Sequence, residues 1–187
     1  GKYYYAEQTE ERDGKHYVKG TDELVQTQIE KMSKSRLNVV NPDEVVAQYG
    51  ADAVRTYEMF MGPLDRDKLW TDEGIQGMYR FLSRVWRLFL SEEDGSLRHA
   101  SDVAFDDKDL KRALHKTIKR VTEALDTMRF NIAIAALMEF LNTCSKIDQL
   151  PREVLETYTL LLAPIVPHIG EELWRKLGHE DTIAYAD

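Results

Sequence analysis

The sequence predicts a mainly α-helical protein: an antiparallel helix bundle preceded by a small α+β segment. Apolar residues recur at helical spacing through most of the chain after residue 70, whereas strand-like signals are confined to residues 1–19. Capping residues and prolines punctuate the periodic stretches, and no internal repeat or low-complexity segment interrupts them. We therefore expect two parts, residues 1–70 and residues 71–187, of which the second forms the bundle.

Length and composition restrict the class of protein. A chain of 187 residues that is 43% hydrophobic can bury one good core plus a small appendage. Its single cysteine, Cys144, excludes a disulfide framework and a cysteine-based zinc site, and it predicts a reducing, cytoplasmic setting. We find no secretory leader and no apolar run that could span a bilayer, so no membrane partner is expected. The net charge of -8 argues against a generally basic nucleic-acid binder but permits a local basic stripe.

Residues 1–19 have the pattern of a β-hairpin. The aromatic run Tyr3–Tyr5 is predicted as one strand, Asp13-Gly14 as the turn, and His16–Val18 as the second strand. An isolated hairpin is marginal in water, so the aromatic strand needs another layer to pack against. Residues 21–29 fit a short helix or an extended segment equally well.

The next stretch carries the most concentrated chemistry in the chain. In Lys31-Met32-Ser33-Lys34-Ser35, two ammonium groups and two hydroxyls surround one apolar side chain. Such donors suit a polyphosphate, because lysine is a compact charge on a flexible stem and hydroxyls add short-range hydrogen bonds. Short basic runs are also common as solvated surface segments, and composition alone favours that interpretation.

Two short helices are predicted directly after this loop. Asn41 can cap a helix over residues 42–49, Pro42 fits its first position, and Gly50 can end it with a positive φ angle. Asp52 is then predicted to cap a second helix that runs to about Phe60.

The first long helix is predicted from Thr71 or Asp72 to about Leu90. Its apolar residues fall on one arc at 100° per residue, and three arginines fall on the opposite arc. The apolar set is Ile75, Met78, Tyr79, Leu82, Val85, Trp86 and Phe89, and the arginines are Arg80, Arg84 and Arg87. We expect Trp86 and also Trp174 to belong to the core.

Three further helical regions complete the predicted bundle. Residues 132–147 are apolar almost all round and should form its most buried helix. Pro151 is expected at the first position of the next helix, and Pro164 and Pro167 should separate that helix from a last one ending at Gly178. The sequence contains no paired His and carboxylates at metal-ligand spacing, no glycine-rich phosphate loop and no nucleophile beside a base.

The remaining predicted helix, from Asp106 or Asp107, bears a basic stripe. Its inward positions are apolar, while nearly all charges on the other face are positive, with only Asp109 in opposition across residues 108–120. Ordinary solvated faces mix both signs, so this pattern makes contact with a phosphate backbone as plausible as a role in solubility alone. The stripe comprises Lys108, Arg112, His115, Lys116 and Lys119, flanked by Lys111 and Arg120.

Several stretches together resemble a known family. Lys31–Ser35 is identical to the second signature of the class I aminoacyl-tRNA synthetases, and residues 38–43 and 49–55 are similar to the family's residues after that signature. Residues 69–75, 80–87, 114–119, 130–135 and 163–169 resemble the leucyl branch of the bacterial type. Isoleucyl and valyl enzymes share the loop but fit residues 70–86 less well.

The resemblance implies a C-terminal piece of such an enzyme, with the end of a Rossmann catalytic domain and a class Ia anticodon-binding bundle. The resemblance to the leucyl branch implies an enzyme that activates leucine with ATP, using Mg²⁺, and transfers it to tRNA(Leu). It implies that Lys34 contacts ATP with help from Lys31, that Ser33 and Ser35 donate hydrogen bonds, and that Met32 is an apolar anchor. The basic stripe would meet tRNA. No metal ligand is expected here, and no tightly bound cofactor.

Two departures limit what the resemblance implies. Family members often carry Lys-Gly after the signature, whereas this chain has Arg36-Leu37, so a glycine-dependent backbone is not expected at residue 37. The first signature, the leucine pocket and any editing domain are absent, so the chain alone should be inactive and should depend on those domains of the same polypeptide. Alternatives are an isoleucyl or valyl enzyme, or a non-enzymatic helical interaction module.

Overall fold

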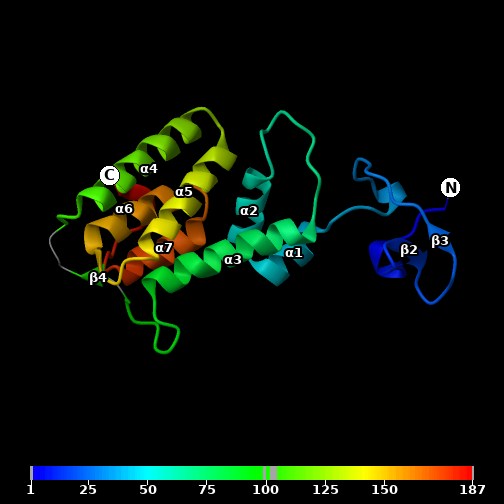
Figure 1. Ribbon diagram of the computed structural model, residues 1–187, viewed down its shortest axis with the longest axis horizontal. Coiled ribbons are helices and arrows are strands. Elements are labelled where there is room, and N and C mark those ends of the chain that lie inside the picture. The colour runs from blue at the N-terminus through cyan, green and yellow to red at the C-terminus, as the bar shows by residue number, and fades with distance from the viewer. Residues whose placement is uncertain (1, 99, 102–104, 187) are drawn as a thin grey trace. The chain divides into compact units, whose positions relative to one another are not determined.

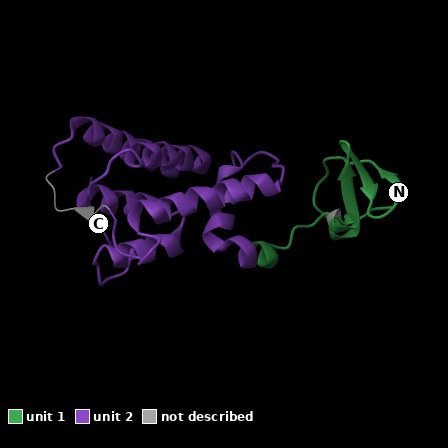
Figure 2. Cartoon of the chain, turned by 60° about the horizontal axis from the view of Figure 1, so that its bottom comes forward, with its two compact units in different colours: residues 1–45 green, residues 46–187 purple. Residues whose placement is uncertain are grey.

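A computed structural model describes residues 2–98, 100–101 and 105–186, in which it places seven α-helices and two small sheets (Figure 1). The chain forms two compact units, residues 1–45 and residues 46–187 (Figure 2). The predicted mainly helical class with a small α+β segment is confirmed. The boundary predicted between residues 70 and 71 separates two functional domains, whereas the boundary after residue 45 separates two compact units. The predicted domain boundary therefore stays a prediction.

The first unit contains a three-stranded antiparallel sheet in the order β1-β2-β3. These strands are Thr9–Arg12, Lys15–Val18 and Leu24–Val25. Asp13 and Gly14 have φ angles of 53° and 72°, which is the geometry of a two-residue hairpin turn. This turn pairs Thr9 with Val18, so Tyr3–Tyr5 lie outside the ladder and were wrongly predicted as the first strand. A 3-10 turn, η1 (Ala6–Gln8), separates them from β1.

The helices after the basic loop are α1 (Pro42–Tyr49) and α2 (Ala51–Phe60). As predicted, Asn41 caps α1, because its Oδ1 accepts a hydrogen bond from the Asp43 amide at 3.1 Å. Gly50 has a φ angle of 84°, a conformation that favours glycine, and it separates the two helices. The predicted cap of α2 by Asp52 is wrong: Gly50 holds the cap position, and Asp52 lies inside the helix.

Asp52 instead caps a helix more than a hundred residues away. Its Oδ2 accepts from the Ile169 amide at 2.7 Å, and its Oδ1 accepts from the His168 amide at 3.4 Å. These amides belong to the first turn of α7 (Pro167–Lys176), whose own cap residue, Val166, has no side chain that could accept them. The carboxylate, only 6% exposed, therefore joins the start of α2 to the start of α7.

Replacing Asp52 should destabilise the protein measurably. We expect Asp52→Ala to lower the free energy of unfolding by about 2 to 3 kcal/mol, because two part-buried amides lose a charged acceptor. Glu73→Ala is the matched control, since Glu73 is an exposed carboxylate in the first turn of α3. Its effect should stay within about 0.5 kcal/mol. Urea unfolding of both variants makes the comparison, and equal midpoints would contradict the capping role.

The bundle consists of α3 (Asp72–Phe89), α4 (Lys108–Asp126), α5 (Phe130–Cys144), α6 (Arg152–Leu162) and α7 (Figure 1). Thr71 caps α3 by accepting from the Gly74 amide, and Asp107 caps α4 by accepting from the Asp109 and Leu110 amides. Pro151 stands one position earlier than predicted, as the residue before α6. It belongs to β5 (Leu150–Pro151), which pairs in parallel with β4 (Ala100–Ser101). A 3-10 turn, η3 (Ile183–Tyr185), comes after α7.

The core of this unit is built around α5, as predicted. Its inward face is fully buried and packs against α2, α3 and α4. The buried Tyr158 of α6 donates its hydroxyl hydrogen to the Leu137 carbonyl at 2.9 Å, and burial raises the Tyr158 pKa. Cys144 is also buried, which raises its thiol pKa to about 12. Both groups therefore stay neutral in the core.

Two aromatic side chains of α3 do not lie where the sequence placed them. Trp174 is buried as predicted, but Trp86 is only half-buried and Tyr79 is 49% exposed. Both rings border a cavity between α2, α3 and α7.

Candidate functional site

The predicted phosphate loop lies in the first unit, after β3 and before α1. Its only regular element is a 3-10 turn, η2 (Lys34–Arg36), which an extended Ser33 precedes. The turn closes through a hydrogen bond of 3.0 Å from the Arg36 amide to the Ser33 carbonyl. The loop backbone is therefore partly ordered by its own hydrogen bonds.

Asn38 braces this loop, a role that sequence reasoning missed. Its Oδ1 accepts from the Ser33 amide at 2.7 Å, and its Nδ2 donates to the Lys31 carbonyl at 3.3 Å. The side chain thus connects the start of the loop to a residue just beyond its end. Asparagine can both donate and accept through one amide, which makes such a bridge possible. The only feature of the sequence that could have indicated this role is the position of Asn38 shortly after the Lys31–Ser35 signature.

The two lysines of the loop are exposed and unneutralised. Among the described residues, no carboxylate lies within ion-pair distance of the ammonium group of Lys31 or Lys34. The hydroxyls of Ser33 and Ser35 hydrogen-bond each other at 2.9 Å. Two free positive charges and a hydroxyl pair are therefore presented together, a donor set that suits an anion with several oxygens.

Met32 and Arg36 differ from the lysines in their surroundings. Met32 is 43% exposed, so the described residues provide no pocket for the predicted apolar anchor. Arg36 forms an ion pair with Glu30, and its guanidinium group lies 6.0 Å from the centre of the Tyr3 ring. Arg36 therefore stabilises the loop within its own unit instead of adding a third free charge.

Residue 37 adopts the conformation that its side chain disfavours. Leu37 has φ and ψ angles of 58° and 30°, which is the left-handed helical region. The expectation that a glycine-type backbone would be absent here is wrong. Leu37 therefore adopts a backbone conformation that favours glycine, at a cost of about 1 kcal/mol.

The predicted basic stripe of α4 is exposed as expected. Its five central members are exposed, while its flanking members, Lys111 and Arg120, are half-buried. Lys111 places its ammonium group 5.2 Å from the centre of the Phe105 ring. The central members are Lys108, Arg112, His115, Lys116 and Lys119.

Acidic partners neutralise part of this stripe. Arg112 pairs with Asp109 at 3.2 Å, and Lys119 pairs with Glu123 at 3.7 Å. Arg120 donates hydrogen bonds to Glu139 of α5 from both terminal guanidinium nitrogens, Nη1 and Nη2. Hydrogen bonding to Arg120 lowers the pKa of the Glu139 carboxyl. Sequence reasoning missed Glu139 because it lies on another helix. Exposed pairs of this kind are weak, so the cations stay available to a stronger anion.

α5 also connects the stripe to the arginines of α3. Arg84 donates from Nη2 to the Asn142 side chain at 2.7 Å, and Glu139 lies one turn before Asn142 on α5. The packing of α5 against both α3 and α4 thus links two sets of basic residues that are separate in the sequence. Arg80, Arg84 and Arg87 are all exposed, as predicted.

Comparison with known proteins identifies the family of this chain. Residues 18–71 match the family described as "tRNA synthetases class I (I, L, M and V)", and residues 107–187 match the "Anticodon-binding domain of tRNA ligase". Leucine–tRNA ligase 1 of Rhizobium johnstonii is 48% identical over 185 residues, which cover 99% of the chain. The chain belongs to the leucyl branch of the class I tRNA synthetases. Within this branch it spans 22% of the length of that relative.

A solved leucyl-tRNA synthetase has a similar fold. The ternary complex of LeuRS, tRNA and LeuAMS from Agrobacterium radiobacter K84 superposes with a TM-score of 0.67 at 34% identity. The match covers 82% of the present chain and 22% of that synthetase. Both predicted sites fall within the matched families: the Lys31–Ser35 loop in the class I region and the α4 stripe in the anticodon-binding domain.

The described part of this synthetase chain offers no evident metal site. Its His, Cys, Asp and Glu side chains nowhere gather in a group of three or more that could hold an ion. In the same residues, every helix is too short or too polar to cross a membrane.

Proposed function

We propose that the chain is the part of a leucine–tRNA ligase that meets ATP through the Lys31–Ser35 loop and tRNA(Leu) through the α4 stripe. The observation that carries this proposal is the pair of unneutralised ammonium groups on a loop braced by Asn38, within a region related to class I synthetases. Residues 1–70 would complete the catalytic domain of the intact, cytoplasmic enzyme, and residues 71–187 would form its tRNA-binding domain.

The chemistry of amino-acid activation fits such a loop. The leucine carboxylate attacks the α-phosphorus of ATP, the bond to the bridging oxygen breaks, and pyrophosphate leaves with increased negative charge. Donors that strengthen their contacts as this charge develops lower the barrier, whereas donors that bind ATP equally throughout do not. Lys34, assisted by Lys31, would supply such contacts, while the Ser33 and Ser35 hydroxyls would orient phosphate oxygens and Met32 would dock when the loop closes on ATP.

Mg²⁺ would assist this reaction in the intact ligase by neutralising phosphate charge. The described residues do not fit a protein-held metal site, because their potential ligands are scattered. The ion would therefore be held by the phosphates and by parts of the ligase outside these 187 residues. This chain contributes positive charge and hydrogen-bond donors, and the remaining catalytic and editing domains would supply the rest.

Charging assays test the proposed substrate. We expect the intact ligase to aminoacylate tRNA with leucine and to reject isoleucine and valine, whereas the 187-residue chain alone should show no ATP–pyrophosphate exchange. A preference for isoleucine or valine would assign the chain to another branch, and turnover by the chain alone would contradict the proposed dependence on other domains. If the chain were a non-enzymatic helical module, it would bind no tRNA.

A further inference from the structure

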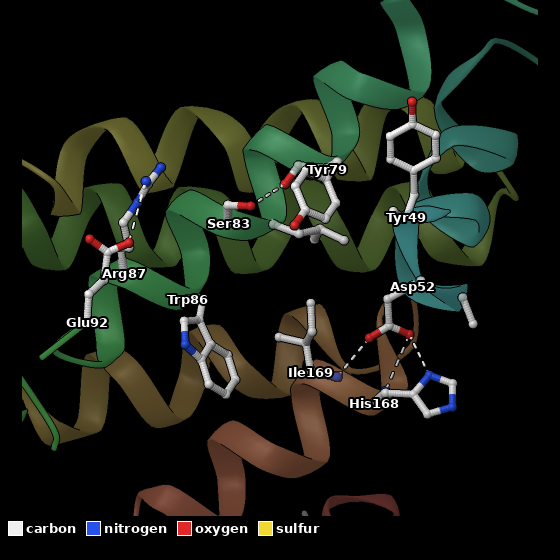
Figure 3. Close-up of a pocket in the computed structure, with 13 residues that line it drawn as sticks. Tyr49, Asp52, Tyr79, Ser83, Trp86, Arg87, Glu92, His168 and Ile169 are labelled. Carbon is white, nitrogen blue, oxygen red and sulfur yellow. Dashed lines mark hydrogen bonds and ion pairs between the residues drawn. The ribbon is translucent and has the colours of Figure 1, made fainter. Parts of the chain in front are cut away.

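A cavity of about 580 Å³ opens in the second unit between the start of α2, the middle of α3 and the start of α7 (Figure 3). Its walls are mainly apolar and aromatic, with Trp86, Tyr79 and Leu82 from α3, Tyr49 from α1 and Ile169 from α7. The proposed aminoacylation chemistry assigns no role to this cavity. Its volume is in the range of small-molecule sites.

Two of these aromatic rings are available for stacking. Trp86 is half-buried and Tyr79 is 49% exposed, and Figure 3 shows both on the cavity side of α3. Tyr79 makes an edge contact with Tyr49, which also lines the cavity, and the two ring centres are 6.0 Å apart. Aromatic faces of this kind stack on unpaired nucleobases without regard to base identity.

Two polar side chains of the cavity, Asp52 and Ser83, already have hydrogen-bond partners within the protein. Both carboxylate oxygens of Asp52 accept hydrogen bonds from α7, one of them also from His168 Nδ1 at 2.9 Å. The Ser83 hydroxyl donates to the Tyr79 carbonyl at 2.8 Å. These two side chains are therefore not free to contact a base edge, and the aromatic rings give the cavity a stacking surface.

Three arginines of α3 form a row that reaches the cavity at Arg87. Arg80, Arg84 and Arg87 fall within an arc of about 60° on α3, and Arg87 is the member nearest to the arc of Tyr79 and Trp86. Arg87 itself lines the cavity, and its pair with Glu92, at 3.7 Å, is exposed and therefore weak. A nucleic-acid strand whose phosphates lie along this row would place its adjoining bases at the mouth of the cavity.

We propose that this cavity takes an unpaired base of an RNA whose phosphates lie on the α3 arginines. The combination of a stacking wall with an adjacent cationic row favours a nucleotide over an apolar peptide, which would gain nothing from the guanidinium groups. This inference rests on the proposed tRNA-binding function and adds to it a second contact, away from the α4 stripe.

Binding of defined oligonucleotides by the 187-residue chain tests the proposal. The probes are a single-stranded hexa-adenylate and an abasic hexamer with the same number of phosphates. We expect the hexa-adenylate to bind about 5- to 100-fold more tightly and to quench tryptophan fluorescence. Trp86→Ala should reduce this preference, while Tyr185→Ala, which removes an aromatic side chain that is 86% exposed and outside the cavity, should leave it intact.

A second variant guards against misfolding of Trp86→Ala. Ser83→Phe should fill the cavity from the same helix and should also abolish the preference for bases, with an unchanged circular dichroism spectrum. Equal affinities of the wild-type chain for both hexamers would overturn the cavity proposal while leaving tRNA binding by the stripe intact. Retention of the preference in both variants would overturn it as well. If the chain bound neither of the hexamers and no tRNA at low salt, both the cavity proposal and the proposed tRNA-binding function would be wrong.

Discussion

Lys34→Ala in the intact ligase should slow leucine-dependent ATP–pyrophosphate exchange by roughly 10² to 10³. One charge-assisted contact that forms with the departing pyrophosphate contributes about 2 to 4 kcal/mol to the transition state. The structure supports a large effect, because no carboxylate among the described residues neutralises Lys34 in advance. The Michaelis constant for leucine should change little, since the lysine is expected to contact phosphate and not the amino acid.

Lys19→Ala is the matched control for this substitution. Lys19 is an exposed lysine of the same unit, next to β2 and outside the loop. Its removal should leave the exchange rate within about twofold. If Lys34→Ala changed the rate no more than the control does, the assignment of Lys34 to the ATP site would be wrong. A large rise in the Michaelis constant for ATP at constant kcat would instead indicate ground-state binding.

The double variant Lys116→Glu and Lys119→Glu should weaken tRNA binding and flatten its dependence on salt. Each phosphate contact contributes about 0.9 to the slope of log affinity against log salt concentration, so the loss of two contacts should reduce the slope by about 1.8. Both lysines are exposed on α4, and the Lys119–Glu123 pair is too weak to withhold the charge from a phosphate.

A second charge-reversed variant separates local contact from total charge. Lys146→Glu with Lys176→Glu changes the net charge equally but lies at or beyond the ends of α5 and α7. We expect this variant to keep most of the affinity and nearly all of the slope. Filter binding across a range of salt concentrations measures both quantities. If both double variants lost the same affinity and the same slope, the stripe would contribute only through the overall charge of the protein.

Local signals predicted the helices well because their determinants lie close together in the chain. Asn41, Pro42 and Gly50 specify α1 through backbone groups within two or three residues, and Thr71 and Asp107 cap their own helices in the same way. The prediction of a strand at Tyr3–Tyr5 was wrong because strand pairing depends on the register set by Asp13-Gly14, and not on β propensity alone. The prediction for the backbone of Leu37 was wrong for a similar reason. The closed turn imposes a positive φ angle that the leucine side chain disfavours.

By itself, the sequence determined the helical class, the loop with its two lysines and the basic face of α4. Each of these features arises from residue order and from helical periodicity, which are local properties. Only the tertiary structure placed Asp52 on the first turn of α7, Glu139 on Arg120, and Trp86 at the wall of a cavity. Packing of distant helices created these contacts, because the buried surface of each helix depends on which partner covers it. Periodicity predicts that a face is apolar, but not what lies against it.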